Sequence, residues 1–116
     1  MPGIAVLCWE ENRPWVSALR QKGFSVPWVE EPKGDAYRQM STVEPELLLV
    51  DLTRLPEQGR EIILDLADRG DLNGVPVVIV SDKSTAGRGL KSKVKKLSVT
   101  TPRKIISAVK TAMEDG

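Results

Sequence analysis

Three short runs of consecutive apolar residues constrain most strongly what this chain can fold into. They span residues 4–7, 47–50 and 75–80. A strand with one face in water alternates apolar and polar residues, whereas these runs are continuous, so each predicts a strand buried on both faces of a parallel sheet. Residues 25–29 and 97–99 are two weaker strand candidates.

Helix-like segments, in which apolar residues recur at helical spacing, lie between these runs. Helices are expected from Asn12 to Gly23, over residues 35–40 and 57–69, and from Pro102 onward. Asn is a common helix cap, proline is favoured in a first turn, and glycine is favoured just beyond a last turn. Residues 84–96 stay open between helix and loop, because Gly87 and Gly89 disfavour a helix at the start of this segment.

The alternation of strands and helices predicts an α/β fold, because parallel strands need crossovers that pack on the faces of the sheet. We expect a flavodoxin-like, doubly wound, five-stranded parallel sheet in the order 2-1-3-4-5, with helices on both faces. The 116 residues fit one domain, which we expect to be either a lone domain or the amino-terminal part of a longer protein. In such folds ligands bind at the carboxyl ends of the strands, so functional residues are expected there.

The composition excludes several classes of site. The chain has no histidine, which removes the commonest general base and the commonest zinc ligand. Its one cysteine, Cys8, permits no internal disulfide and is expected to be a small buried apolar residue. No glycine-rich nucleotide loop follows the first run, and no stretch has the length of a membrane helix or the layout of a signal peptide. These features predict a cytoplasmic protein that is not an enzyme and does not bind a membrane.

Three stretches at the predicted strand ends form one pattern when they are taken in order along the chain. Residues 47–59 read LLLVDLTRLPEQG, residues 75–81 read VPVVIVS, and residues 99–102 read VTTP. In this order and at these distances they resemble the receiver domains of two-component response regulators. The resemblance implies a signal-transduction function. It also implies that Asp51 stands at the phospho-acceptor position, and that Ser81 stands at a switch position.

Two departures from the receiver pattern determine the expected activity. Cys8 and Trp9 stand where receivers carry an acidic pair that holds Mg²⁺, and neither offers a hard oxygen ligand. Thr101, at the second switch-like position, replaces the lysine of receivers and brings no charge to a phosphoryl group. We therefore expect a pseudo-receiver that is phosphorylation-deficient, has no metal or other cofactor, and carries Trp9 as a plug over the metal position.

Two other interpretations of these residues stay open. In the first, Asp51 is a polar residue that closes a buried strand and caps the next turn, and Ser81 belongs to a strand-to-loop hydrogen-bonding pair. In the second, the chain is a phosphorylatable receiver with Asp51 as the acceptor. Glu10 and Glu11 would then join Asp51 as unorthodox ligands of Mg²⁺.

Charge is distributed unevenly along the chain. Residues 82–110 carry nine basic residues and one acid, a charge of +8, which leaves −7 for the rest of a chain whose net charge is +1. The corresponding face of receivers contacts partners, so we expect a protein partner, a tethered output domain or a dimer partner to bind it. A solvated face is another interpretation, and nucleic acid is a weaker one, because no aromatic residue interleaves with the cations for stacking. The expected partner-binding residues are Arg88, Lys91, Lys95, Lys96, Arg103 and Lys104.

Overall fold

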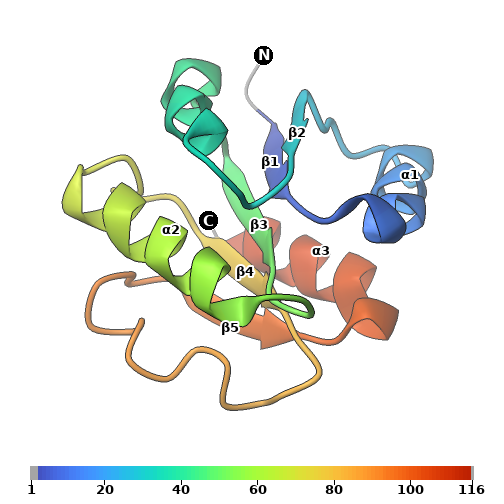
Figure 1. Cartoon of the computed structure of the whole chain (residues 1–116). Helices are drawn as coiled ribbons and strands as arrows, with labels where there is room; N and C mark the ends of the chain where they lie inside the picture. The colour runs from blue at the N-terminus through green and yellow to red at the C-terminus, as the bar shows by residue number, and fades with distance from the viewer. Residues whose placement is uncertain (1–2, 116) are drawn as a thin grey trace.

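Five parallel strands form one sheet in residues 3–115, the part of the chain that the computed structural model describes (Figure 1). They are β1 (Ile4–Leu7), β2 (Trp28–Glu30), β3 (Leu47–Asp51), β4 (Val77–Val80) and β5 (Leu97–Thr100). Their order is β2-β1-β3-β4-β5, and each neighbouring pair is parallel. The structure confirms the expected α/β fold and its flavodoxin-like strand order.

Helices cover both faces of this sheet, as expected (Figure 1). The α-helices are α1 (Arg13–Gln21), α2 (Pro56–Asp68) and α3 (Ile105–Asp115), and the 3-10 helices are η1 (Glu10–Asn12), η2 (Ala36–Val43) and η3 (Pro102–Lys104). One face packs against α2 and η2, and the other packs against α1 and α3. The helix expected over residues 35–40 forms as η2. No helix among residues 3–115 is long and apolar enough to cross a membrane.

The two covered faces explain why the strand residues form continuous apolar runs. In β3, Leu48 and Val50 belong to the apolar cluster under α2, whereas Leu47 and Leu49 belong to the cluster under α1 and α3. All four side chains are fully buried. Successive side chains of a strand point to opposite faces, so a strand covered on both sides offers no polar position until it ends. In β3 that end is Asp51.

Two strands begin later than expected because of proline. The strand expected over residues 75–80 begins at Val77, directly after Pro76. The strand expected over residues 25–29 is reduced to β2, which begins directly after Pro27. Proline has no N–H to donate to a ladder, so regular pairing starts beyond it.

Residues 84–96, between β4 and β5, form a series of turns instead of a helix (Figure 1). Gly89 has a φ of 82°, in the left-handed region that an α-helix does not contain. Gly87 lies so close to β5 that an added Cβ would stand 3.1 Å from Leu97 Cδ2. Leu90 is fully buried and anchors the segment to the core. The open question about this segment is therefore decided in favour of a loop.

Candidate functional site

Asp51 is the last residue of β3, and its side chain is fully buried. Its Oδ1 atom accepts hydrogen bonds from the backbone N–H of Thr53 at 2.8 Å and from the Thr53 hydroxyl at 2.5 Å. Its Oδ2 atom accepts a hydrogen bond from the side-chain amide of Asn12, which also donates to the Thr53 hydroxyl at 3.2 Å. Both carboxylate oxygens are thus engaged inside the protein, where they hold the turn that follows β3.

Asn12 takes part in this network instead of capping a helix. It stands directly before α1, as expected for a cap, but its side chain makes no capping hydrogen bond to the first turn. The expected capping role of Asn12 is therefore wrong. A helix-capping side chain accepts a backbone N–H through its oxygen, whereas Asn12 donates its side-chain N–H to the Asp51 carboxylate. The first turn also contains Pro14, which has no N–H to be capped.

Trp9, Glu11 and Arg54 tie the loop after β1 to the loop after β3. The Trp9 side chain is 5% exposed, and its indole N–H donates to the carbonyl oxygen of Arg54 at 3.0 Å. The guanidinium carbon of Arg54 lies 4.9 Å from the centre of the Trp9 ring. The same guanidinium forms an ion pair with Glu11, with an N–O distance of 3.0 Å. These contacts close the surface beside Asp51 with an aromatic ring and a paired cation.

The residues at the expected metal position do not fit Mg²⁺. Burial raises the pKa of the Cys8 thiol to about 11, so the thiol stays protonated near neutral pH. Trp9 supplies no oxygen ligand. The carboxylate of Glu11 is paired with Arg54, and a backbone hydrogen bond and this guanidinium hold its pKa below the ordinary value. In residues 3–115, no group of three His, Cys, Asp or Glu side chains is placed to hold a metal ion.

Ser81 and Thr101 lie at the same end of the sheet as Asp51, the end where the parallel strands finish, because β3, β4 and β5 end in neighbouring register. Ser81 is buried, and its hydroxyl accepts a hydrogen bond from the backbone N–H of Lys83 at 3.1 Å. Thr101 is exposed, and its carbonyl oxygen accepts a hydrogen bond from the N–H of Lys104 at 3.0 Å. Within the described residues, no hydrogen bond joins the side chains of Asp51, Ser81 and Thr101. Ser81 and Thr101 form hydrogen bonds within their own turns, and Asp51 also accepts one from the distant Asn12.

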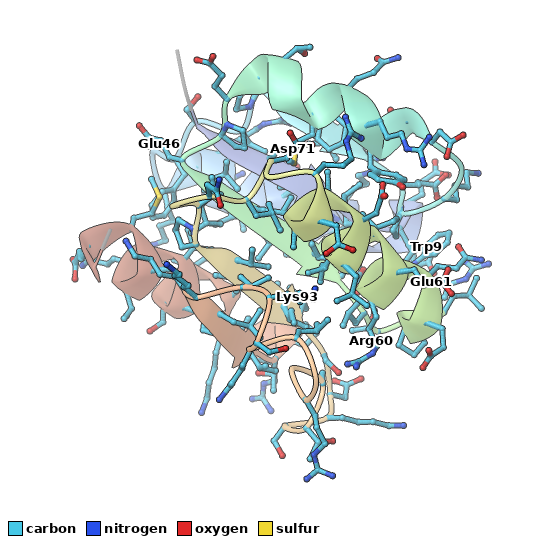
Figure 2. All side chains as sticks on the ribbon, turned by 90° about the vertical axis from the view of Figure 1, so that its left-hand side faces the viewer. Trp9, Glu46, Arg60, Glu61, Asp71 and Lys93 are labelled. Atoms are coloured by element: carbon cyan, nitrogen blue, oxygen red, sulfur yellow. The ribbon has the colours of Figure 1, made fainter. Side chains whose placement is uncertain are left out.

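A cleft of about 550 Å³ lies beside this end of the sheet, between the start of α2 and the loop after β4. Its walls include Thr53, Ser81, Asp82 and Lys83, but Asp51 does not line it. Arg60 of α2 also lines the cleft, and its guanidinium donates to the carbonyl oxygens of Ala86 and Arg88 at 2.7 and 2.6 Å (Figure 2). The hydrogen bonds of Arg60 therefore hold the loop after β4 in place. The buried carboxylate of Asp51 does not open into the cleft.

The six residues expected to bind a partner are all exposed and lie along the chain on either side of β5. Arg88 and Lys91 belong to the loop, Lys95 and Lys96 directly precede β5, and Arg103 and Lys104 belong to η3. None of the six forms an ion pair within residues 3–115. Lys93, by contrast, is paired with Asp68 at 3.3 Å. The charge of these six side chains is thus available to an acidic partner.

Asn12, Thr53 and Arg54 lie within the strand-end segments where functional residues were expected, but sequence reasoning assigned none of them a role in this network and gave Asn12 a capping role instead. Thr53 had a local signal, because an Asp side chain often accepts the N–H of the residue two places later. Asn12 and Arg54 had no local signal, because their partners are distant in the sequence. Asn12 lies 39 positions from Asp51, and Arg54 lies 43 positions from Glu11. Contacts of this kind depend on how the strand ends are brought together by the sheet.

Comparison with protein-family models, with curated proteins and with solved structures finds no match to this chain. Two features of the molecule itself bear on its function. One is the engaged carboxylate at the end of β3, and the other is the basic surface around β5.

Proposed function

We propose that this chain is a receiver-like signal-transduction module, not an enzyme, that is not switched by phosphorylation and acts by binding another protein. The observation that carries the proposal is the state of Asp51, which is fully buried and accepts hydrogen bonds from Asn12 and Thr53 on both oxygens. A phospho-acceptor needs an oxygen free to attack and a cation that neutralises the incoming charge. Phosphorylation of Asp51 would require this network to open.

The surroundings of Asp51 support the same proposal. Trp9 fills a position where receivers carry a metal-binding acid, and its hydrogen bond to the Arg54 carbonyl holds the indole in place. Thr101 brings a hydroxyl where receivers carry a lysine, and its exposed side chain makes no hydrogen bond to Asp51 in the described structure. The donor set for Mg²⁺ and the charge partner for a phosphoryl group are both replaced.

The basic surface around β5 supports a protein partner with an acidic surface, whether a separate protein, a tethered output domain or a second copy. Its six expected binding residues, Arg88, Lys91, Lys95, Lys96, Arg103 and Lys104, are exposed and have no carboxylate partners among the described residues. Complementary charge mainly increases the rate of encounter and the specificity of binding, so such an association is expected to weaken as salt is added.

The proposal is tested by titrating the chain with Mg²⁺ and then with beryllium fluoride, a phosphoryl mimic. Tryptophan fluorescence and the amide resonances of Thr53 and Ser81 are followed. Because the site offers no fitting ligands, we expect no saturable change in either signal at millimolar Mg²⁺. The variant Trp9→Phe identifies the contribution of Trp9 to the emission of the three tryptophans.

The matched control for this titration is Asp51→Asn. We expect its titration to be as flat as that of the unmodified chain, and its binding of a protein partner to be unchanged. A saturable response that disappears in Asp51→Asn would overturn the proposal. It would instead favour the phosphorylatable receiver, with Glu10 or Glu11 recruited as ligands of Mg²⁺.

A further inference from the structure

Strand β5 forms one edge of the sheet, and among residues 3–115 its one partner strand is β4. The N–H of Val77 donates to the carbonyl of Lys96 at 2.8 Å, and the N–H of Ser81 donates to the carbonyl of Thr100 at 2.9 Å. In a parallel strand, the backbone N–H and C=O groups of every second residue point toward the same neighbouring strand. The N–H and C=O groups of Leu97 and Val99 therefore point away from β4, toward the open edge.

The loop after β4 leaves a groove along this edge. A cleft of about 540 Å³ lies between the loop and β5, and its lining includes Thr85, Arg88, Lys91, Leu97 and Val99. Leu97 and Val99 are only partly buried and pack against the core from its margin. An added Cβ on Gly87 would stand 3.1 Å from Leu97 and 3.2 Å from Val99, so the loop lies directly on their side chains. The groove thus combines an apolar floor with unpaired backbone groups.

All the charged side chains that line this groove and the neighbouring cleft are positive. Arg88 and Lys91 line it, and Lys95 and Lys96 line a second cleft of about 250 Å³ against Leu97. None of these four cations has a carboxylate partner in the described part of the chain. Figure 2 shows nitrogen-tipped side chains projecting outward from this end of the molecule.

The opposite edge of the sheet provides an internal comparison. It is formed by β2, whose last residue is Glu30, followed by Glu31. Glu31 is paired with Lys33 at 3.0 Å, so the β2 edge carries acidic side chains and a paired cation. Unpaired cations such as Lys95 and Lys96 are a property of the β5 edge. Lysines beside an edge strand discourage pairing with apolar strands, but they favour a strand that carries carboxylates.

We infer that the β5 edge binds an extended acidic peptide segment of a partner, which adds to the sheet as a sixth strand. Its backbone pairs with Leu97 and Val99, and its carboxylates lie against Arg88, Lys91, Lys95 and Lys96. Addition of a strand to an open edge draws affinity from main-chain hydrogen bonds and specificity from the side chains around them. This inference rests on the proposed function, because it names the class of partner for the proposed protein binding.

The test uses the full chain and a fluorescein-labelled peptide of alternating Glu and Val residues, followed by fluorescence anisotropy. Two further peptides carry backbone N-methyl groups, one on all Glu residues and the other on all Val residues. Only one set of alternate residues can face β5, so one methylated peptide should bind about tenfold more weakly and the other like the parent. Amide exchange of Leu97 and Val99 should slow when the parent peptide binds.

Charge reversal provides a second, independent measurement. Arg88→Glu/Lys91→Glu should weaken binding of the parent peptide by about tenfold or more, because both side chains line the groove. The matched control, Lys22→Glu/Lys110→Glu, makes the same change of charge beside a cleft between α1 and α3. This control should bind the parent peptide within about twofold of the unmodified chain, because salt screens distant charges.

Several outcomes would overturn the inference. The two methylated peptides could bind equally well, or the two charge-reversal pairs could lose the same affinity. Duplex DNA carrying the same total charge as the peptide could displace it, or the chain could associate with itself through the β5 edge. A chain that shows no response to Mg²⁺ but fails to bind the peptide would contradict only this inference. A saturable Mg²⁺ response would contradict the proposed function, whatever the peptides do.

Discussion

At the scale of single residues, the carboxylate of Asp51 is stabilised by neutral hydrogen-bond donors. They are the side-chain amide of Asn12 and the N–H and hydroxyl groups of Thr53. A hydrogen bond to a charged group contributes about 1.5–3 kcal/mol, whereas a buried charge without partners is far more costly. The network therefore joins the start of α1 to the end of β3.

Replacing Asp51 with alanine tests this structural role. Asp51→Ala leaves the Thr53 N–H and the Asn12 amide without their acceptor, so we expect the free energy of unfolding to fall by about 2–3 kcal/mol. Urea denaturation followed by tryptophan fluorescence measures it. The control Asp82→Ala, at an exposed position after β4, should change it by less than about 0.5 kcal/mol. Equal losses in the two variants would show that the Asp51 carboxylate is not structural.

The thiol of Cys8 gives a second prediction at this scale. Burial raises its pKa from 9.0 to about 11, and only the thiolate reacts with disulfide reagents. The folded chain should therefore be inert to such a reagent at about pH 8, and the chain unfolded in urea should react. Because the pKa is raised by folding, the contribution of the protonated thiol to stability is full below pH 9.0 and is lost as the pH rises toward about 11. Rapid labelling of the folded chain would contradict the burial of Cys8.

At the scale of elements, α2 holds the end of β3 and the loop after β4 in place. Gly59 lies against Leu52, so that an added Cβ would overlap Leu52 Cδ2. The next residue, Arg60, donates to the carbonyl oxygens of Ala86 and Arg88. Adjacent residues of the helix thus contact the segments that border the cleft on either side.

The variant Gly59→Ala tests the close approach of α2 to β3. Alanine favours a helix over glycine by about 1 kcal/mol, but overpacking against a buried side chain costs about 1–3 kcal/mol. We expect a net loss of about 1 kcal/mol in the free energy of unfolding, measured by urea denaturation. In a Leu52→Ala background, where the overlapping atom is removed, Gly59→Ala should instead stabilise the chain. Stabilisation in the unmodified background would disprove the close packing.

At the scale of the whole molecule, the sheet turns an uneven sequence into a separation of charge in space. Residues 82–110 carry a charge of +8 and the rest of the chain −7. The strand order places β5 and β2 at opposite edges, with Lys95 and Lys96 beside one and Glu30 and Glu31 beside the other. A net charge close to zero therefore conceals a strongly basic edge.

Cation-exchange chromatography near neutral pH tests this separation. Lys96→Glu and Lys22→Glu each lower the net charge from +1 to −1, and both positions are exposed. If retention depends on the basic edge, Lys96→Glu should elute at a clearly lower salt concentration than Lys22→Glu. Equal elution of the two variants would show that net charge alone governs binding to the resin.

Much of the fold could be predicted, because the burial of a strand on both faces appears in consecutive residues. Residues 4–7 and 47–50 lie in strands as expected, and Gly23 and Gly70 follow the ends of α1 and α2 with positive φ. The candidate site could be predicted only in part. The position of Asp51 at a strand end followed from the apolar run before it, but its hydrogen-bond partners did not.

The sequence by itself determined the buried runs, the alternation of strands and helices, and the imbalance of charge, since these follow from local periodicity and from counts of residues. The strand order was expected only from the type of fold that this alternation predicts, and the pairing of distant strands established it. Only the tertiary structure decided that Asn12 donates to Asp51 instead of capping α1, and that residues 84–96 form turns along β5. The physical reason is distance along the chain. A polar side chain forms its hydrogen bond with the acceptor that folding brings to it, and here that acceptor lies 39 positions away.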